Sequence, residues 1–177
     1  RCWLSDEGLA PLRAGVGGTG LLYRVEGRAR RGDGDRGGEA ALLRCELDGL
    51  PLHEASGVAY SSTTTGRHHA CGHDGHAAML PAALALLHAH RERWSGAVCG
   101  LFQPAEETGT GAHAVISDCG AMAALEAAGG VNNAFALHNI PERPLGQVLL
   151  RPEGTMARAS TGLRITLRGS QSHAAMP

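Results

Sequence analysis

Apolar runs with the length of β-strands alternate along this chain with segments of helical spacing. The runs are ALLRCEL (41–47), GAVCGLF (96–102) and NAFAL (133–137), and Gly or Pro follows each of them within a few residues. Strands that alternate with helices in this way are typical of α/β proteins. Between the first two runs, a helix buried along one face is indicated by the spacing of Met79, Leu80, Ala83, Leu84 and Leu87. We therefore predict an α/β fold.

Polar side chains follow these runs where the expected strands end. Asp48 follows the first run, Glu106 and Glu107 follow the second, and His138 follows the third. In α/β sheets, functional sites collect at the carboxyl ends of the strands. We therefore expect these four side chains to lie at a common site.

A turn rich in metal-binding residue types precedes the predicted helix. The segment RHHACGHDGH (67–76) contains His68, His69, Cys71, His73, Asp74 and His76. Cys71 and His73 are two positions apart, so in an extended segment their side chains leave on one side and can converge on one ion. Thiolate, imidazole and carboxylate together suit zinc or a neighbouring transition metal better than calcium or magnesium. Two alternatives are purely structural roles for these residues and a Cys71–His nucleophile pair, although no third orienting residue stands at a recognisable spacing.

The adjacent acids Glu106 and Glu107 indicate how such a metal could be used. Neighbouring side chains in a loop point in different directions, so one carboxylate can bind metal while the other acts as a general base. A solvated surface pair is the plainer alternative. Pro104 and the glycines at 109 and 111 favour the site, because they let the chain fold closely around it.

The composition excludes several other classes of protein. The chain has 177 residues, 43% of them hydrophobic, with a formal net charge of -1, which gives no electrostatic reason to expect a nucleic-acid or membrane partner. Its five cysteines are an odd number without close pairing, which argues against a disulfide scaffold. Because the chain begins without Met and stops directly after a motif, we expect both ends to be cut. We expect a cytoplasmic location.

Four motifs carry a resemblance to a known family. HACGHDGHAAML, FQPAEETGTGA, ALHNIP and GSQSHAAMP occur in that order. Together they resemble the amidohydrolase branch of the aminoacylase and carboxypeptidase metallopeptidase family, which includes hippurate hydrolases, N-acyl-amino-acid deacylases and auxin-conjugate hydrolases. The resemblance covers residues 41–177 and implies a metal-dependent amidohydrolase. Such an enzyme uses metal-activated water to cleave the amide bond of N-acyl amino acids or related small amides and peptides.

The resemblance also assigns roles to individual residues. It implies two divalent metal ions, zinc or manganese in the first place and cobalt or nickel as alternatives. The implied ligands are Cys71, His73, Glu107 and His138. Glu106 would be the general base, and Asp48 would orient a ligand histidine from behind it. The remaining histidines of the turn, His68, His69 and His76, would be surplus to the ligand set.

The implied architecture is a three-layer α/β/α catalytic domain of the zinc-peptidase type, here residues 1–156, followed by the start of an α+β lid and dimerisation domain at residues 157–177. Alternation of apolar and polar residues over 162–169 predicts a strand with one wet face. His173 matches a lid histidine that polarises the scissile carbonyl, often across a homodimer; a plain turn residue is the alternative.

Departures from the family pattern limit what the chain can do by itself. ELDGLP stands at 46–51 where relatives usually have Ala after the Asp, and Pro81 removes one helical hydrogen bond and can kink the helix. Relatives supply one further His ligand from a C-terminal segment that is absent here. The alternative function is therefore that of a truncated, non-catalytic relative acting as a metal-binding or interaction module.

Overall fold

The structure is a computed structural model that describes residues 3–29, 40–151, 153–156 and 161–175. The chain divides into two compact units, residues 1–140 and 141–177. Every helix and strand assigned among the described residues belongs to the first unit. No helix in the described part of the chain is both long and apolar enough to cross a membrane.

A mixed five-stranded sheet forms the centre of the first unit. In spatial order its strands are β1 (Arg13–Val16), β2 (Gly20–Arg28), β4 (Ser95–Gln103), β3 (Ala40–Glu46) and β5 (Val131–Ala136). Strands β3, β4 and β5 are parallel to their neighbours in this set. Strands β1 and β2 form a hairpin across the Gly-rich turn, and β2 pairs with β4 in the antiparallel sense. The predicted α/β fold is confirmed.

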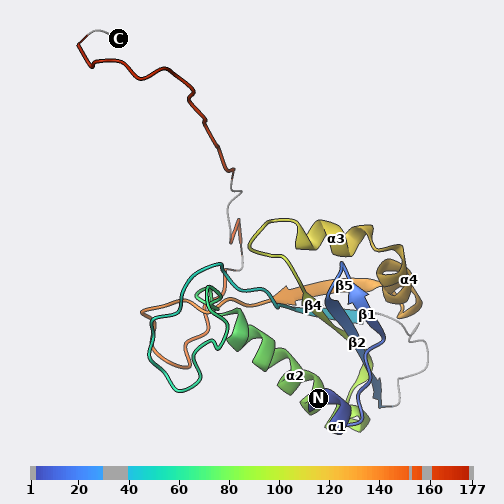
Figure 1. The fold of residues 1–177 in the computed structure, drawn as a ribbon. Coiled ribbons are helices and arrows are strands. Elements are labelled where there is room, and N and C mark those ends of the chain that lie inside the picture. The colour runs from blue at the N-terminus through green and yellow to red at the C-terminus, as the bar shows by residue number, and fades with distance from the viewer. Residues whose placement is uncertain (1–2, 30–39, 152, 157–160, 176–177) are drawn as a thin grey trace. The chain divides into compact units, whose positions relative to one another are not determined.

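Helices cover both faces of this sheet (Figure 1). Helix α1 (Trp3–Asp6) and the longer α2 (His73–Ala89), which a 3₁₀ turn (Arg91–Arg93) follows, lie on one face. Helices α3 (Gly111–Ser117) and α4 (Cys119–Ala127) lie on the other. Alternate side chains of each strand point to opposite faces, and two separate hydrophobic cores result. The unit therefore has the three layers that the resemblance implies.

The two cores hold the helices against the strands. Below α3 and α4, the core includes Leu22, Cys99, Leu101, Val115 and Leu125. Below α2, it includes Tyr23, Val25, Phe102, Leu80 and Leu84. Each of these buried apolar side chains contributes about 1.5–3 kcal/mol through removal from water, which fixes α2 relative to the strands that lead into the candidate site.

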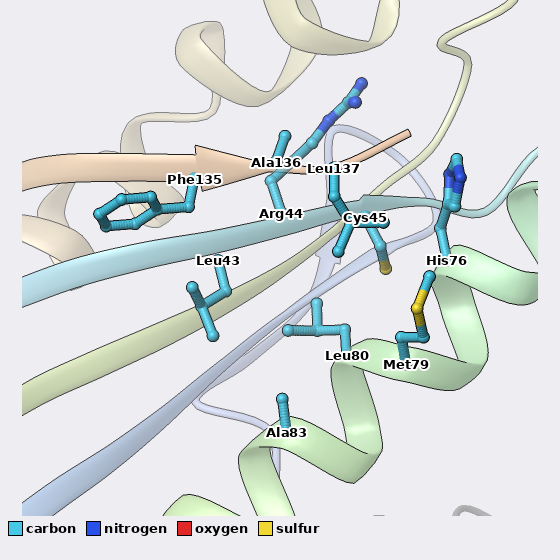
Figure 2. Close-up of a pocket in the computed structure, with 10 residues that line it drawn as sticks. All are labelled: Leu43, Arg44, Cys45, His76, Met79, Leu80, Ala83, Phe135, Ala136 and Leu137. Carbon is cyan, nitrogen blue, oxygen red and sulfur yellow. The ribbon is translucent and has the colours of Figure 1, made fainter. Parts of the chain in front are cut away.

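Helix α2 follows its predicted pattern with one exception. Leu80 and Leu84 are buried, and the helix continues past Pro81 to Ala89, so the proline costs a single backbone hydrogen bond. Met79, predicted to be buried, is 44% exposed, because it borders an apolar pocket of about 180 Å³ that also adjoins Leu43 and Phe135. Figure 2 shows Met79, Leu80 and Ala83 projecting from α2 toward β3 around this pocket.

The second unit differs from the prediction. No strand is assigned over residues 162–169, and their side chains are exposed, so the predicted strand is wrong. A strand needs a neighbour to satisfy its backbone N–H and C=O groups, and the described residues of this unit contain no strand that could pair with it. The predicted domain boundary at residue 157 lies outside the described residues and stays a prediction.

Candidate metal centre

The candidate site lies where β3, β4 and β5 end. Asp48 lies two residues beyond β3, Glu106 three residues beyond β4, and His138 two residues beyond β5. His73 is the first residue of α2 and reaches the same edge, where its ring contacts Asp48. Since parallel strands present their carboxyl ends together, the sheet brings side chains from four separate segments into one place.

Cys71 and His138 face each other at this edge. The Cys71 Sγ atom lies 3.4 Å from His138 Nε2. On the other side of the ring, His138 Nδ1 donates a hydrogen bond of 2.7 Å to the carbonyl oxygen of Asn139. That bond fixes the tautomer in which Nε2 carries a lone pair, so the nitrogen that faces the thiol is the one that can bind a cation.

His73 has the same arrangement of its two ring nitrogens. Its Nδ1 donates a 2.9 Å hydrogen bond to the backbone carbonyl of Asp48. Its Nε2 is buried and has no hydrogen-bond partner; it lies 3.8 Å from Glu106 Oε2 and 3.9 Å from Glu107 Oε1. Nε2 is therefore the ring nitrogen that faces the two glutamates, and Nδ1 is occupied by the Asp48 carbonyl.

Asp48 holds two of the neighbouring groups in place. Its Oδ2 accepts a 2.9 Å hydrogen bond from the backbone N–H of Glu107. Burial raises the pKa of the Asp48 carboxyl, but the backbone N–H groups of Glu107 and Glu106 outweigh this and hold the pKa below its usual value. The Asp48 backbone carbonyl accepts the bond from His73, whose Nδ1 lies 3.5 Å from the carboxylate. Asp48 thus contacts His73 mainly through its main chain.

Unpaired acceptor atoms at this edge fit a bound cation. Among the described residues, four buried side-chain nitrogen or oxygen atoms have no hydrogen-bond partner, and three of them are Asp48 Oδ1, His73 Nε2 and Glu107 Oε1. Leaving such an atom unsatisfied costs about 1–3 kcal/mol, and a cation bound by His73 Nε2 and Glu107 Oε1 would satisfy those two. The chain offers thiolate, imidazole and carboxylate donors here, which suit zinc and neighbouring transition metals.

Three groups of the described side chains at this edge have the spacing of a metal site, and within each group the donor atoms lie within 4.8 Å of one another. One is Glu46, His73 and His76. The two that contain the other predicted ligands are Cys71, His73 and His138, and His73, Glu106 and Glu107. His73 is common to all three groups. All four residues predicted as ligands therefore lie at this edge, together with the predicted base.

The environment of Cys71 argues against the alternative of a nucleophile pair. Burial raises the pKa of its thiol, and the carboxylates of Glu107 and Glu106 raise it further. A nucleophilic cysteine needs a lowered pKa. Without a cation this thiol stays protonated, whereas a bound metal ion would displace the proton.

The other histidines occupy different surroundings. His76 is buried, with Nδ1 2.8 Å from Glu46 Oε2, and His68 lies 3.8 Å from Glu54. Glu46 has no role in the sequence-based prediction, although a carboxylate at the end of a buried strand needs a partner for its charge. His173 is exposed in the second unit, where its Nδ1 accepts a hydrogen bond from Ala175; its role at a substrate stays a prediction.

Comparisons with known proteins agree with the resemblance. A family model described as peptidase family M20/M25/M40 matches residues 42–175. N-acetylcysteine deacetylase of Bacillus subtilis (strain 168) is 31% identical over all of this chain, which spans 43% of that protein. The Arabidopsis thaliana IAA-amino acid hydrolase ILR1-like 5 is 38% identical over 76% of this chain, equal to 29% of its own length. The chain thus spans less than half of these relatives.

One solved structure is similar to this chain in both fold and sequence. The crystal structure of the Bacillus subtilis YXEP protein, described as a dinuclear metal-binding peptidase of the M20 family, superimposes with a TM-score of 0.68. It is 33% identical, and the match covers 81% of this chain and 36% of that one. The family resemblance carried by the four motifs is confirmed.

Proposed function

Because the chain belongs to the peptidase family M20/M25/M40, we propose that the protein is a metal-dependent amidohydrolase that cleaves the amide bond of N-acyl amino acids. The observation that carries this proposal is the set of three buried acceptor atoms without partners at one sheet edge. The names of the two relatives support the substrate class, since an N-acetylated cysteine and an amino-acid conjugate each contain an amide bond.

The ligands in this proposal are Cys71, His73, Glu107 and His138. Two divalent ions at such a site polarise the amide carbonyl and lower the pKa of the attacking water. The donor chemistry supports zinc or manganese, with cobalt or nickel as alternatives.

Glu106 is the proposed general base. Its side chain is 40% exposed, whereas that of Glu107 is 21% exposed, so Glu106 is the member of the pair with more access to a substrate. Its carboxylate takes a proton from the attacking water and delivers it to the leaving nitrogen. An acid beside the ligand set argues against the non-catalytic alternative, because a module that only binds metal has no use for a base.

Asp48 and His173 complete the proposed machinery. Asp48 positions Glu107 through its carboxylate and His73 through its backbone carbonyl. The resemblance of the GSQSHAAMP motif supports His173 as the group that polarises the scissile carbonyl, across a homodimer. A cytoplasmic location remains a prediction.

The experiment compares two His→Asn variants. His73→Asn removes a donor common to both ligand groups, and His113→Asn is a matched control, because His113 is exposed on α3. After dialysis against zinc or manganese, elemental analysis should find metal in the wild type and the control but little in His73→Asn, and only the first two should hydrolyse N-acetyl amino acids. A wild-type protein that retains no divalent metal would overturn the proposal.

A further inference from the structure

His76 connects two segments of the chain that carry proposed ligands. It lies on α2 one turn beyond His73, is buried, and places Nδ1 2.8 Å from Glu46 Oε2. Its Nε2 lies 2.8 Å from the side-chain Oδ1 of Asn139 and 3.0 Å from the Asn139 backbone nitrogen. The ring therefore bridges the end of β3 and the segment after β5.

Asn139 contacts both of the ligand-bearing segments. Its backbone carbonyl oxygen accepts the 2.7 Å hydrogen bond from His138 Nδ1. Its side chain packs on Gly72, where an added Cβ would lie 2.3 Å from Asn139 Nδ2. Gly72 stands between Cys71 and His73 and has a left-handed φ of 81°, a conformation that favours glycine. One residue thus fixes the tautomer of His138 and the backbone position of the Cys71–His73 turn.

Glu46 anchors this connection to the sheet. Its carboxylate also pairs with Arg44, whose Nε donates a 3.0 Å hydrogen bond to Gln103 of β4. Burial raises the pKa of Glu46, and the His76 hydrogen bond and the Arg44 charge together hold it below the usual value. Glu46 and His76 partner each other and are absent from the unpaired buried atoms at this edge. Because the polar atoms of both side chains already have hydrogen-bond partners, these residues are placed to support the ligands and not to bind the metal themselves.

From these contacts we infer that His76 and Asn139 are positioning residues of the metal centre. They hold Cys71, His73 and His138 at the spacing that a shared cation needs. This inference rests on the proposed function, because it concerns the same site. Groups that orient metal ligands from outside typically change metal affinity by about 10–100-fold when they are removed, although they do not touch the ion.

The test measures Co²⁺ binding to the protein by absorption spectroscopy. Thiolate ligation by Cys71 gives a charge-transfer band, the d–d bands report coordination geometry, and competition with a chelator gives the Kd. His76→Phe removes the ring contacts with Glu46 and Asn139. Asn139→Ala removes the side chain that contacts His76 and packs on Gly72. For both variants we expect Co²⁺ affinity about 10–100-fold weaker than in the wild type, with altered d–d bands. His76→Gln keeps a side-chain amide, with both a donor and an acceptor, beside Asn139 and should recover part of the loss.

A matched core variant separates positioning from simple loss of stability. Leu84 lies two turns beyond His76 on the same helix and is fully buried among apolar residues. Leu84→Ala should lower the free energy of unfolding while the folded protein keeps the wild-type Co²⁺ spectrum and affinity. Asn139 is exposed as a residue, so Asn139→Ala remains informative if His76→Phe does not fold.

The outcomes distinguish this inference from the proposal on which it rests. Wild-type spectra and affinities in both His76→Phe and Asn139→Ala would refute the positioning role and leave the metal centre intact. The positioning role would also be refuted if Leu84→Ala changed the Co²⁺ spectrum as much as His76→Phe and Asn139→Ala do. A wild-type protein without any thiolate-to-cobalt band would refute the metal centre, and this inference with it.

Discussion

The contact between Leu84 and Gly100 sets how closely α2 approaches β4. Leu84 is 0% exposed. A Cβ added to Gly100 would lie 3.1 Å from Leu84 Cδ2 and 2.6 Å from Leu84 Cδ1, and the second distance is closer than two carbon atoms can pack. Because α2 carries His73 and β4 leads to Glu106, a side chain at position 100 would displace one segment of the candidate site relative to the other.

The expected energies follow from this geometry. Gly100→Ala adds a methyl group to filled space and should lower the free energy of unfolding by about 1–3 kcal/mol. Leu84→Ala removes both contacting methyl groups from a fully buried position and should cost about 2–5 kcal/mol. In the double variant the new methyl group enters the space that Leu84 vacated. We therefore expect it to be about as stable as Leu84→Ala alone, a coupling energy of about 1–3 kcal/mol.

Urea unfolding followed by far-UV circular dichroism measures the four free energies of this cycle. Gly75→Ala is the control for the glycine replacement, because Gly75 lies on α2 and nothing stands within 4 Å of its added Cβ. That variant should gain up to about 1 kcal/mol from helix propensity. If the two destabilisations simply add in the double variant, α2 and β4 are not in tight contact at Leu84 and the packing argument fails.

Three further predictions concern the site and a helix terminus. Glu106→Gln should retain its metal and lose about 10²–10⁴-fold in kcat, whereas Glu107→Gln should lose metal as well. Elemental analysis and turnover measurements distinguish the two variants. Unchanged turnover in metal-loaded Glu106→Gln would exclude Glu106 from the mechanism. Cys71 has a raised pKa, so iodoacetamide should label it faster as the pH rises in metal-free protein and should not label it in the metal-loaded form; a trapped acyl-thioester would contradict this. The side chain of Asp118 caps α4 through the Ala121 N–H, and this hydrogen bond holds the pKa of Asp118 below its usual value. Asp118→Asn should therefore destabilise the protein at pH 7, and the difference in the free energy of unfolding should vanish as the pH falls through the lowered pKa, because only the carboxylate form contributes. A difference that persists in acid, measured by urea unfolding, would contradict the charge argument.

Local structure and donor chemistry could be predicted from the sequence, because both are encoded in short segments. The spacing of Leu80 and Leu84 predicted the buried face of α2, and the apolar runs predicted β3, β4 and β5. Turn residues marked where each strand ends, and the side chains that follow were expected to lie together. The kinds of donor on Cys71 and His73 already favoured a transition metal.

Only the tertiary structure decided which distant groups meet. The strand order and the antiparallel position of β2 beside β4 do not follow from hydrophobic period. Residues 162–169 have a strand's alternation yet no strand is assigned there, because pairing depends on a neighbour. His76 and Asn139 are 63 positions apart, and nothing in either residue type predicts that the two are in contact. Such contacts arise from the packing of the whole sheet and its helices, so the geometry that would hold a cation becomes visible only once the chain is folded.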